Sequence, residues 1–439
     1  MRLSIPTLFL LLALAGCASY HPLPLATQVP IPSSTHQTVA AAGQGIDFQQ
    51  PLTGTEVAQI AVMLNPNLRA LRAERGVAQA QVFAAGLLPD PQLSLSADLP
   101  SNVSQGYFNA YGIGLQWNLA SLFTRSTRLA AARAQRRSVQ YQVAWQEWML
   151  ANQARIQARR WYYLHRQETL AAAATQVSTQ LYRVAQENLQ QGDTTISSAT
   201  LRQIAYLDSQ DQQLALQRQL SKARLQLNQT LGLPPDFRVQ VAAPRPLGPI
   251  PPVSQLVALA IQHRLDLRAL RAGYAAQEAQ VRTAILGQYP AFSIGVSHAA
   301  DTSNIQTFGP SINLSIPLWN RNRGAIAQAR ATRAQLHAAY SARLFQTRAE
   351  ISALVRDLQR LQAEITPLAQ QVPALQKAEQ RLRVAASEHD VTLLDYETVR
   401  SQSLAKSLQL LSLQEAQSTE EAALEMAVGI PWQEWKQTP

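Results

Sequence analysis

The sequence predicts a mainly α-helical protein that also carries a membrane-spanning sheet, built from two tandem copies of one unit. The motif LRALRA occurs at residues 68–73 and again at 267–272, in matching surroundings and 199 residues apart. Each copy is followed by two short segments in which apolar and polar residues alternate, and then by a long stretch of helical character. Because self-similarity at a fixed offset reflects a repeated structural unit, the repeat organises the whole chain.

The chain begins with a predicted lipoprotein signal peptide. Arg2 precedes an apolar run that ends in LAGC, and Cys17 of this segment is the only cysteine among the 439 residues. This arrangement is typical of a secretory signal. LAGC resembles the bacterial lipobox, so we expect Cys17 to carry the lipid anchor, palmitate included. Ala18 stands where a retaining aspartate would otherwise be, which implies the outer membrane. A chance cysteine at the end of an ordinary signal is the alternative.

Charge and hydropathy exclude two classes of protein. The net charge is +10, but the basic residues are scattered along helical stretches with few aromatic residues between them, which argues against nucleic-acid binding. After Cys17 there is no apolar run of about 18 residues, so no transmembrane helix is expected. A membrane crossing would therefore need β-structure.

Four segments have the alternation of half-buried strands, at about residues 91–99, 110–119, 290–298 and 309–318. One side of each is apolar, and the other carries glycine, serine and other small or polar residues. A length of about nine residues suits a strand that spans lipid. A two-sided sheet in water is the alternative for any single strand. The residues that fit interfacial anchors near the strand ends are Tyr107, Phe108, Trp117, Tyr289 and Trp319.

Two long helices follow the strand pairs, at residues 124–191 and 322–388. The first stretch contains neither proline nor glycine. The second carries apolar residues that step alternately by three and four from Ile351 to Leu375, the spacing of a coiled-coil seam. Pro367 and Pro373 lie inside this run. Because the spacing continues through them, we expect them to kink the helix rather than end it.

Each long helix ends in a polar turn, near residues 192 and 389, followed by a return helix. Gly192 suits a helix end with positive φ, and Asp193, Thr194 or Thr195 can cap the next helix. The expected organisation is a signal peptide (1–16), an anchored tether (17–51), a first repeat (52–230), a proline-rich equatorial connector (231–252), a second repeat (253–428) and a tail (429–439).

Four strands cannot close a barrel, and lipid does not tolerate an open sheet edge. The chain is therefore expected to oligomerise. Four strands per chain give eight in a dimer or twelve in a trimer, and only the larger number leaves an aqueous lumen.

At this point the chain resembles a TolC-type outer-membrane factor, a member of the outer membrane efflux protein family in the lipoprotein branch of RND-type tripartite pumps. The segment SIPLWNRNRGAIAQARA at 315–331 is similar to the family's entry to its long helix, although Trp319 and Asn320 depart from the commonest residues. TLLD at 392–395 is similar to the segment just inside the periplasmic tip.

The resemblance implies a homotrimer with a twelve-stranded β-barrel in the outer membrane of a Gram-negative bacterium and a long periplasmic α-barrel. It also implies a passive exit duct that receives substrates from an inner-membrane pump of the RND type and a periplasmic adaptor. In the family, acidic rings narrow the tunnel at the tip. Asp395 and Glu397 are the gate candidates by this match, while Thr398 replaces a second aspartate of some members. Asp395 as a simple helix cap is the alternative.

The resemblance further places adaptor docking at the two tips. The docking candidates are Gly192, Asp193, Thr194, Thr195, His389, Asp390, Val391 and Thr392.

No enzyme chemistry is expected. The seven histidines have no metal-ligand spacing, and no phosphate-binding loop occurs, so neither a catalytic residue, a metal nor a cofactor is predicted. Two other functions stay open: a structural coiled-coil lipoprotein without a pore, and the exit duct of a type I secretion system. The cargo could be drugs, metal cations or secreted molecules.

Overall fold

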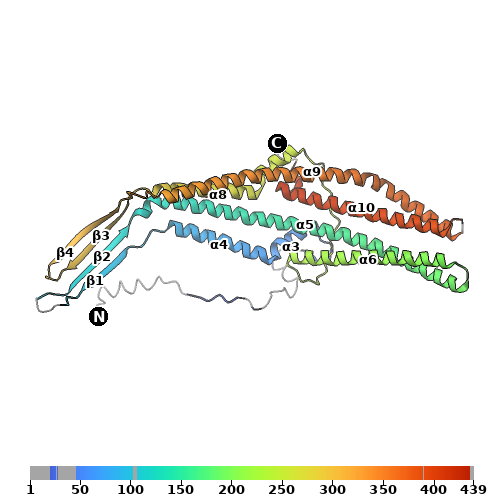
Figure 1. Cartoon of the computed structure of the whole chain (residues 1–439), viewed down its shortest axis with the longest axis horizontal. Helices are drawn as coiled ribbons and strands as arrows, with labels where there is room; N and C mark the ends of the chain where they lie inside the picture. Colours follow the sequence, from blue (N-terminus) through green and yellow to red (C-terminus); the bar gives the residue numbers. More distant parts are fainter. Residues whose placement is uncertain (1–19, 26, 28–45, 102–105, 389, 436–439) are drawn as a thin grey trace.

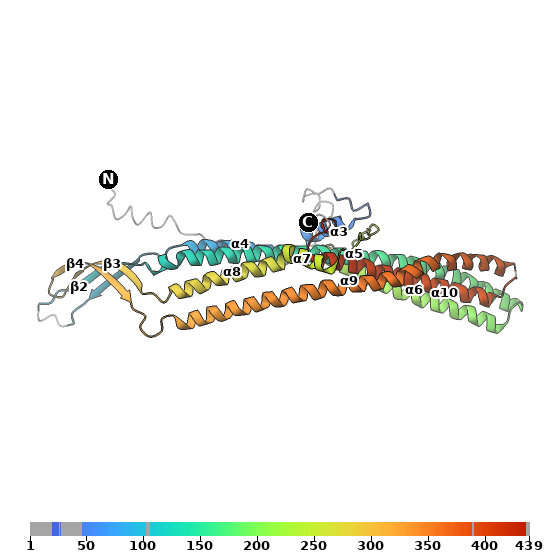
Figure 2. The ribbon, with the colours of Figure 1, turned by 90° about the horizontal axis from the view of Figure 1, so that it is seen from above.

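The computed structural model describes residues 20–25, 27, 46–101, 106–388 and 390–435. The molecule is elongated. A β-sheet lies at one end, and the two turns that connect long helices to their return helices lie at the other (Figures 1 and 2). The predicted signal peptide with Cys17 lies outside the described residues, as do most of the tether and His389.

The same order of elements occurs twice along the chain. The first series is α3 (Gly54–Leu64), α4 (Pro66–Gly86), β1 (Gln92–Asp98), β2 (Ala110–Asn118), α5 (Ala120–Gln191) and α6 (Ile196–Leu231). The second is α7 (Val253–His263), α8 (Leu265–Leu286), β3 (Ala291–Ala300), β4 (Gln306–Ser315), α9 (Arg323–Ser387) and α10 (Leu393–Val428), with a short 3-10 helix η2 (Trp432–Glu434) at the end. The two LRALRA motifs lie in α4 and α8.

The sheet is antiparallel in the order β1-β2-β3-β4, and its two faces differ in chemistry. Leu115 of β2 lies between Leu93 and Val296, whereas its neighbour Gly114 lies between Ser94 and Ser297. The predicted alternation is therefore present in three dimensions. The apolar face includes Leu93, Leu95, Ile113, Leu115, Trp117, Ile294, Val296, Phe308, Ile312 and Leu314, and the opposite face includes Ser94, Ser96, Gly112, Gly114, Gln116, Ser293, Gly295, Ser297, Ser311 and Asn313.

The fourth strand lies three residues earlier than predicted, at 306–315 instead of 309–318. The reason is a tight turn after β3. The Asp301 carboxylate accepts hydrogen bonds from the backbone N–H groups of Ser303 (2.8 Å) and Ile305 (2.9 Å), so β4 can pair with β3 from Gln306 onward. The predicted loop was longer because this aspartate turn was not recognised.

Two very long helices, α5 with 72 residues and α9 with 65, extend from the sheet to the far end (Figure 1). As predicted, α9 continues through Pro367 and Pro373. Ile351, Ile365 and Val372 of its seam are buried. None of the described helices combines the length and the apolar character needed to cross a membrane.

Two hydrophobic cores form in the middle of the molecule, one for each series of elements. In the first, Ile60 of α3 packs with Leu227 and Leu231 of α6. In the second, Leu256 of α7 packs with Ile351 of α9 and with α10 residues that include Leu424. The connector between the series forms no helix, and its Val241 pairs with Leu52 in a parallel bridge.

Arg264, between α7 and α8, is a buried charged residue that joins α8 to α10 beside the second core. Its side chain is 1% exposed and donates to both carboxylate oxygens of Asp266 (3.0 and 2.8 Å) and to the carbonyl oxygen of Ala427 (2.8 Å). The guanidinium also lies 4.8 Å from the ring centroid of Trp145. The pKa of Asp266 is lowered, because the hydrogen bonds and charges of Arg264 and Arg343 outweigh burial.

We predict that Gly429→Ala destabilises the protein more than Gly192→Ala. Both glycines have positive φ, 87° and 82°, so alanine is strained at either position. At Gly429 a Cβ would also lie 2.9 Å from Cγ of Arg264, whereas at Gly192 nothing lies within 4 Å. We expect a loss of about 1 kcal/mol for Gly192→Ala and about 3 kcal/mol for Gly429→Ala. Thermal melting followed by circular dichroism tests this, and equal losses would contradict it.

Candidate functional site

The α5–α6 turn and the α9–α10 turn lie together at the end of the molecule opposite the sheet (Figures 1 and 2). In the α5–α6 turn Gly192 adopts φ 82°, and Oγ1 of Thr195 accepts a hydrogen bond from the Ser198 N–H at 3.2 Å. The predicted positive φ of Gly192 is thus confirmed. Of the three candidate caps, Thr195 is the one that caps α6.

A threonine also caps the helix that follows the α9–α10 turn. Thr392 caps α10, because its Oγ1 accepts a hydrogen bond from the Asp395 N–H at 3.1 Å and donates to Oδ2 of Asp395 at 2.5 Å. Asp390 is exposed and Val391 is half-buried. A carboxylate in the first turn of a helix is also favoured by the helix dipole. In the single chain, Asp395 is therefore an exposed residue of the first turn of α10, and its carboxylate accepts a hydrogen bond from the capping Thr392.

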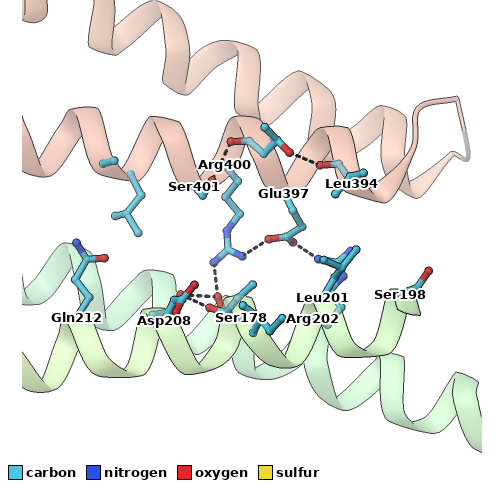
Figure 3. Close-up of a pocket in the computed structure, with 16 residues that line it drawn as sticks. Ser178, Ser198, Leu201, Arg202, Asp208, Gln212, Leu394, Glu397, Arg400 and Ser401 are labelled. Carbon is cyan, nitrogen blue, oxygen red and sulfur yellow. Dashed lines mark hydrogen bonds and ion pairs between the residues drawn. The ribbon is translucent and has the colours of Figure 1, made fainter. Parts of the chain in front are cut away.

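Glu397, two residues further along α10, points between the two hairpins rather than outward (Figure 3). It forms ion pairs with Arg202 of α6 and with Arg400 of α10, the latter at 3.3 Å. Arg400 in turn donates to the carbonyl oxygen of Ala174 (2.6 Å) and to Oγ of Ser178 (3.2 Å), both on α5. This group, the tip ion-pair network, joins α5 and α6 of the first hairpin to α10 of the second.

The tip ion-pair network is largely shielded from water. The Arg202 and Glu397 side chains are 5% and 16% exposed. Burial lowers the pKa of the Arg202 guanidinium, although the nearby Glu397 carboxylate opposes this effect. Removing one partner would leave the other charge buried and unpaired, which costs about 3–5 kcal/mol.

A pocket of about 330 Å³ lies beside this network, between α6 and α10. Leu201, Ile204 and Leu404 give it an apolar side, while Arg202 and Glu397 give it a charged one. Figure 3 shows the side chains of the two helices facing one another across it.

A second set of ion pairs joins the hairpins nearer the middle of the molecule. Arg155 of α5 contacts Glu425 of α10 at 2.8 Å, and Arg159 lies 3.6 Å from Glu421. Burial raises the pKa of both glutamates in spite of the arginines. The hairpins are thus held together at two levels.

The structure separates the two gate candidates. Asp395 lies on the exposed first turn of α10, whereas Glu397 faces Arg202. Sequence reasoning missed Arg202 and Arg400. The Glu397–Arg400 spacing of three residues was a signal for one of them, but the sequence offered none for Arg202, because its partner lies 195 residues away. Among the described residues, no group of three His, Cys, Asp or Glu could hold a metal ion.

Comparison with known proteins supports the resemblance. Residues 256–430 match the family described as outer membrane efflux protein. No curated protein matches the chain significantly in sequence. The resemblance to this family that the sequence predicted is confirmed.

Several solved structures share the fold across nearly the whole chain. CusC, whose crystal structures concern transmembrane channel formation, has a TM-score of 0.72 at 16% identity, over 93% of this chain and 99% of that one. VceC, an outer membrane protein of Vibrio cholerae, gives 0.70 at 20% identity, over 86% and 96%. The CmeC outer membrane channel of Campylobacter jejuni gives 0.73 at 14% identity, over 86% and 85%. At these identities the comparison establishes the fold.

We predict that Glu397 and Arg202 are energetically coupled. Glu397→Gln and Arg202→Gln should each destabilise the tip by about 3 kcal/mol, and the double variant should lose clearly less than their sum. Amide hydrogen exchange over the first turns of α6 and α10 measures this loss. Asp357→Asn is the control, since the Asp357–Arg360 pair is exposed and its removal should have no measurable effect. Additive losses would show that the pair is not coupled.

Proposed function

Starting from a second repeat that matches the outer membrane efflux protein family, we propose that the protein is an outer-membrane channel that serves as the exit duct of a tripartite efflux system. It conducts substrates passively from an inner-membrane pump of the RND type and a periplasmic adaptor to the exterior. The main support for the proposal is the chemistry of the two faces and the edges of the sheet. One face is apolar and largely exposed, the other is lined by glycine and polar residues, and β1 and β4 are its edges.

A homotrimer completes this sheet. Three copies bring twelve strands together in a closed barrel, with apolar faces toward lipid and the glycine-, serine- and glutamine-bearing faces toward water. The two long hairpins of each copy form the periplasmic α-barrel. Cys17 carries the lipid anchor, and residues 17–51 connect it to the two repeats, 52–230 and 253–428.

The helical turns are the periplasmic entrance. Here Asp395 of each copy contributes one carboxylate to a ring, and like charges in a narrow lumen favour cations. Glu397 acts differently, by holding α10 against α6 through Arg202. The docking surface for the adaptor consists of both turns, around Gly192 and Asp390, and the energy for transport comes from the inner-membrane partner.

Conduction tests the function directly. Purified full-length protein should migrate as a heat-labile trimer and conduct ions in planar bilayers. Asp395→Ala should raise single-channel conductance about twofold, because it removes the charge and bulk of the ring. Asp357→Ala, which removes an exposed carboxylate from α9, is the matched control and should leave conductance unchanged. A monomer that never conducts would refute the channel, while an unchanged conductance in Asp395→Ala would refute only the gate.

Docking of the adaptor at the tips gives a separate prediction. Asp193→Lys and Asp390→Lys should abolish efflux in cells, because each reverses a charge on the proposed docking surface. Both variants should still assemble as trimers, as judged by migration without heating. Asp236→Lys in the exposed connector is the control and should pump normally. Normal efflux by the two tip variants would show that the adaptor docks elsewhere.

A further inference from the structure

The junction between the sheet and the helices carries a band of exposed arginine and aromatic side chains. Three aromatic residues, Phe123, Tyr289 and Trp319, are 60%, 64% and 87% exposed. Four exposed arginines accompany them, and we call the seven residues the arginine–aromatic collar. The arginines are Arg125 of α5, Arg282 of α8, Arg321 before α9 and Arg323 at the start of α9.

Contacts between the elements show that these segments lie next to one another. Arg125 Nε donates to the carbonyl oxygen of Gly86 at the end of α4 (2.8 Å), and Asn322 Nδ2 donates to that of Ala284 in α8 (2.7 Å). The Phe123 ring lies 5.7 Å from that of Phe292 in β3. Figure 2 shows the start of α9 and the end of α8 where they meet the strands.

The collar is strongly basic, and its charge is not neutralised within the chain. The segments 84–91, 119–130, 282–290 and 316–330 contain six arginines and a single acidic residue, Asp90. None of the four collar arginines forms an ion pair with a carboxylate in the described part of the chain. Four exposed guanidinium groups without a carboxylate partner, gathered at the junction of the sheet and the helices, favour an anionic partner.

The opposite end of the sheet has the reverse character. The segments 98–110 and 298–306 contain Asp98 and Asp301 but neither lysine nor arginine. The positive charge is therefore confined to the helical end of the sheet. A general need for solubility would not produce this difference between the two ends.

The chemistry of the collar fits a phospholipid surface. Exposed aromatic side chains at the border of an apolar face are typical of a membrane interface. The guanidinium group binds phosphate through paired hydrogen bonds, and basic residues beside a membrane are attracted to anionic lipids. The collar also borders the apolar face of the sheet, because Phe123 contacts Phe292, the cross-strand partner of Leu314.

We propose that the arginine–aromatic collar binds the phosphate headgroups of anionic phospholipids in the leaflet that faces the helices. This inference rests on the proposed function, since it requires the sheet to lie in a membrane. The lipids would fix the depth at which the sheet sits. Arg125, Arg282, Arg321 and Arg323 bind the phosphates, and Phe123, Tyr289 and Trp319 lie among the headgroups.

Lipid binding to the full-length protein in detergent tests the proposal, with phosphatidylglycerol and phosphatidylcholine as probes and native mass spectrometry as the readout. Wild-type protein should retain phosphatidylglycerol at least about tenfold more strongly, and this preference should weaken with salt. The collar variant Arg125→Gln/Arg282→Gln/Arg321→Gln/Arg323→Gln should show a preference within about twofold of unity. The control Arg218→Gln/Arg348→Gln/Arg356→Gln/Arg381→Gln removes four exposed arginines elsewhere and should keep it.

Equal retention of the two lipids by wild-type protein would overturn the proposal without any variant. Equal loss in the control variant would also overturn it, because net charge would then be responsible. Full competition by millimolar inorganic phosphate would show a site for free phosphate instead of a membrane surface. Conductance separates this proposal from the channel: a protein that conducts but shows no lipid preference refutes only the collar, while one that neither trimerises nor conducts refutes the channel itself.

Discussion

The structure depends most on the unpaired backbone groups at the two edges of its sheet. β1 and β4 lie at the ends of the strand order, and the apolar face between them is exposed in the single chain. In water such a face would be unfavourable, and in lipid the free N–H and C=O groups of the edges would be equally so. If each edge pairs with another copy, the edge N–H and C=O groups are hydrogen-bonded, and the apolar face can then lie in lipid. The proposed assembly and its lumen both follow from this constraint.

The helices connect this sheet to a site far away. At a rise of about 1.5 Å per residue, α5 alone reaches about 100 Å. Over such a length the hairpins need lateral contacts, and the chain supplies them at two levels. Arg155 and Glu425 join α5 to α10 near the middle, and the Arg202–Glu397 pair joins α6 to α10 near the tip. The outer level lies at the proposed entrance, where a change in helix spacing would widen it.

Local patterns were sufficient to predict much of this fold. Alternation in the four short segments predicted strands, and steps of three and four residues predicted α9 even through Pro367 and Pro373. Helix-end chemistry predicted the positive φ of Gly192 and gave Thr195 as one of three candidate caps of α6, but it did not predict the Thr392 cap of α10. The position of β4 was wrong by three residues, because the Asp301 turn depends on side-chain hydrogen bonds that have no periodic signal.

The site was less predictable than the fold, because its contacts join distant parts of the chain. Asp395 and Glu397 were identified as acidic residues near the tip, but nothing in the sequence distinguished an exposed carboxylate from one that faces Arg202. Predicting that difference requires knowing that α6 lies against α10.

Cysteine cross-linking between the two sheet edges tests the central claim most directly. Leu95→Cys in β1 would be combined in turn with cysteines at positions 308–314 of β4, and the Leu115→Cys/Val296→Cys pair, adjacent within one chain, is the internal control. If the edges pair between copies, mild oxidation of membranes should give covalent trimers for particular pairs on alternate residues. Monomers across the whole series, with the internal control cross-linked, would contradict the account.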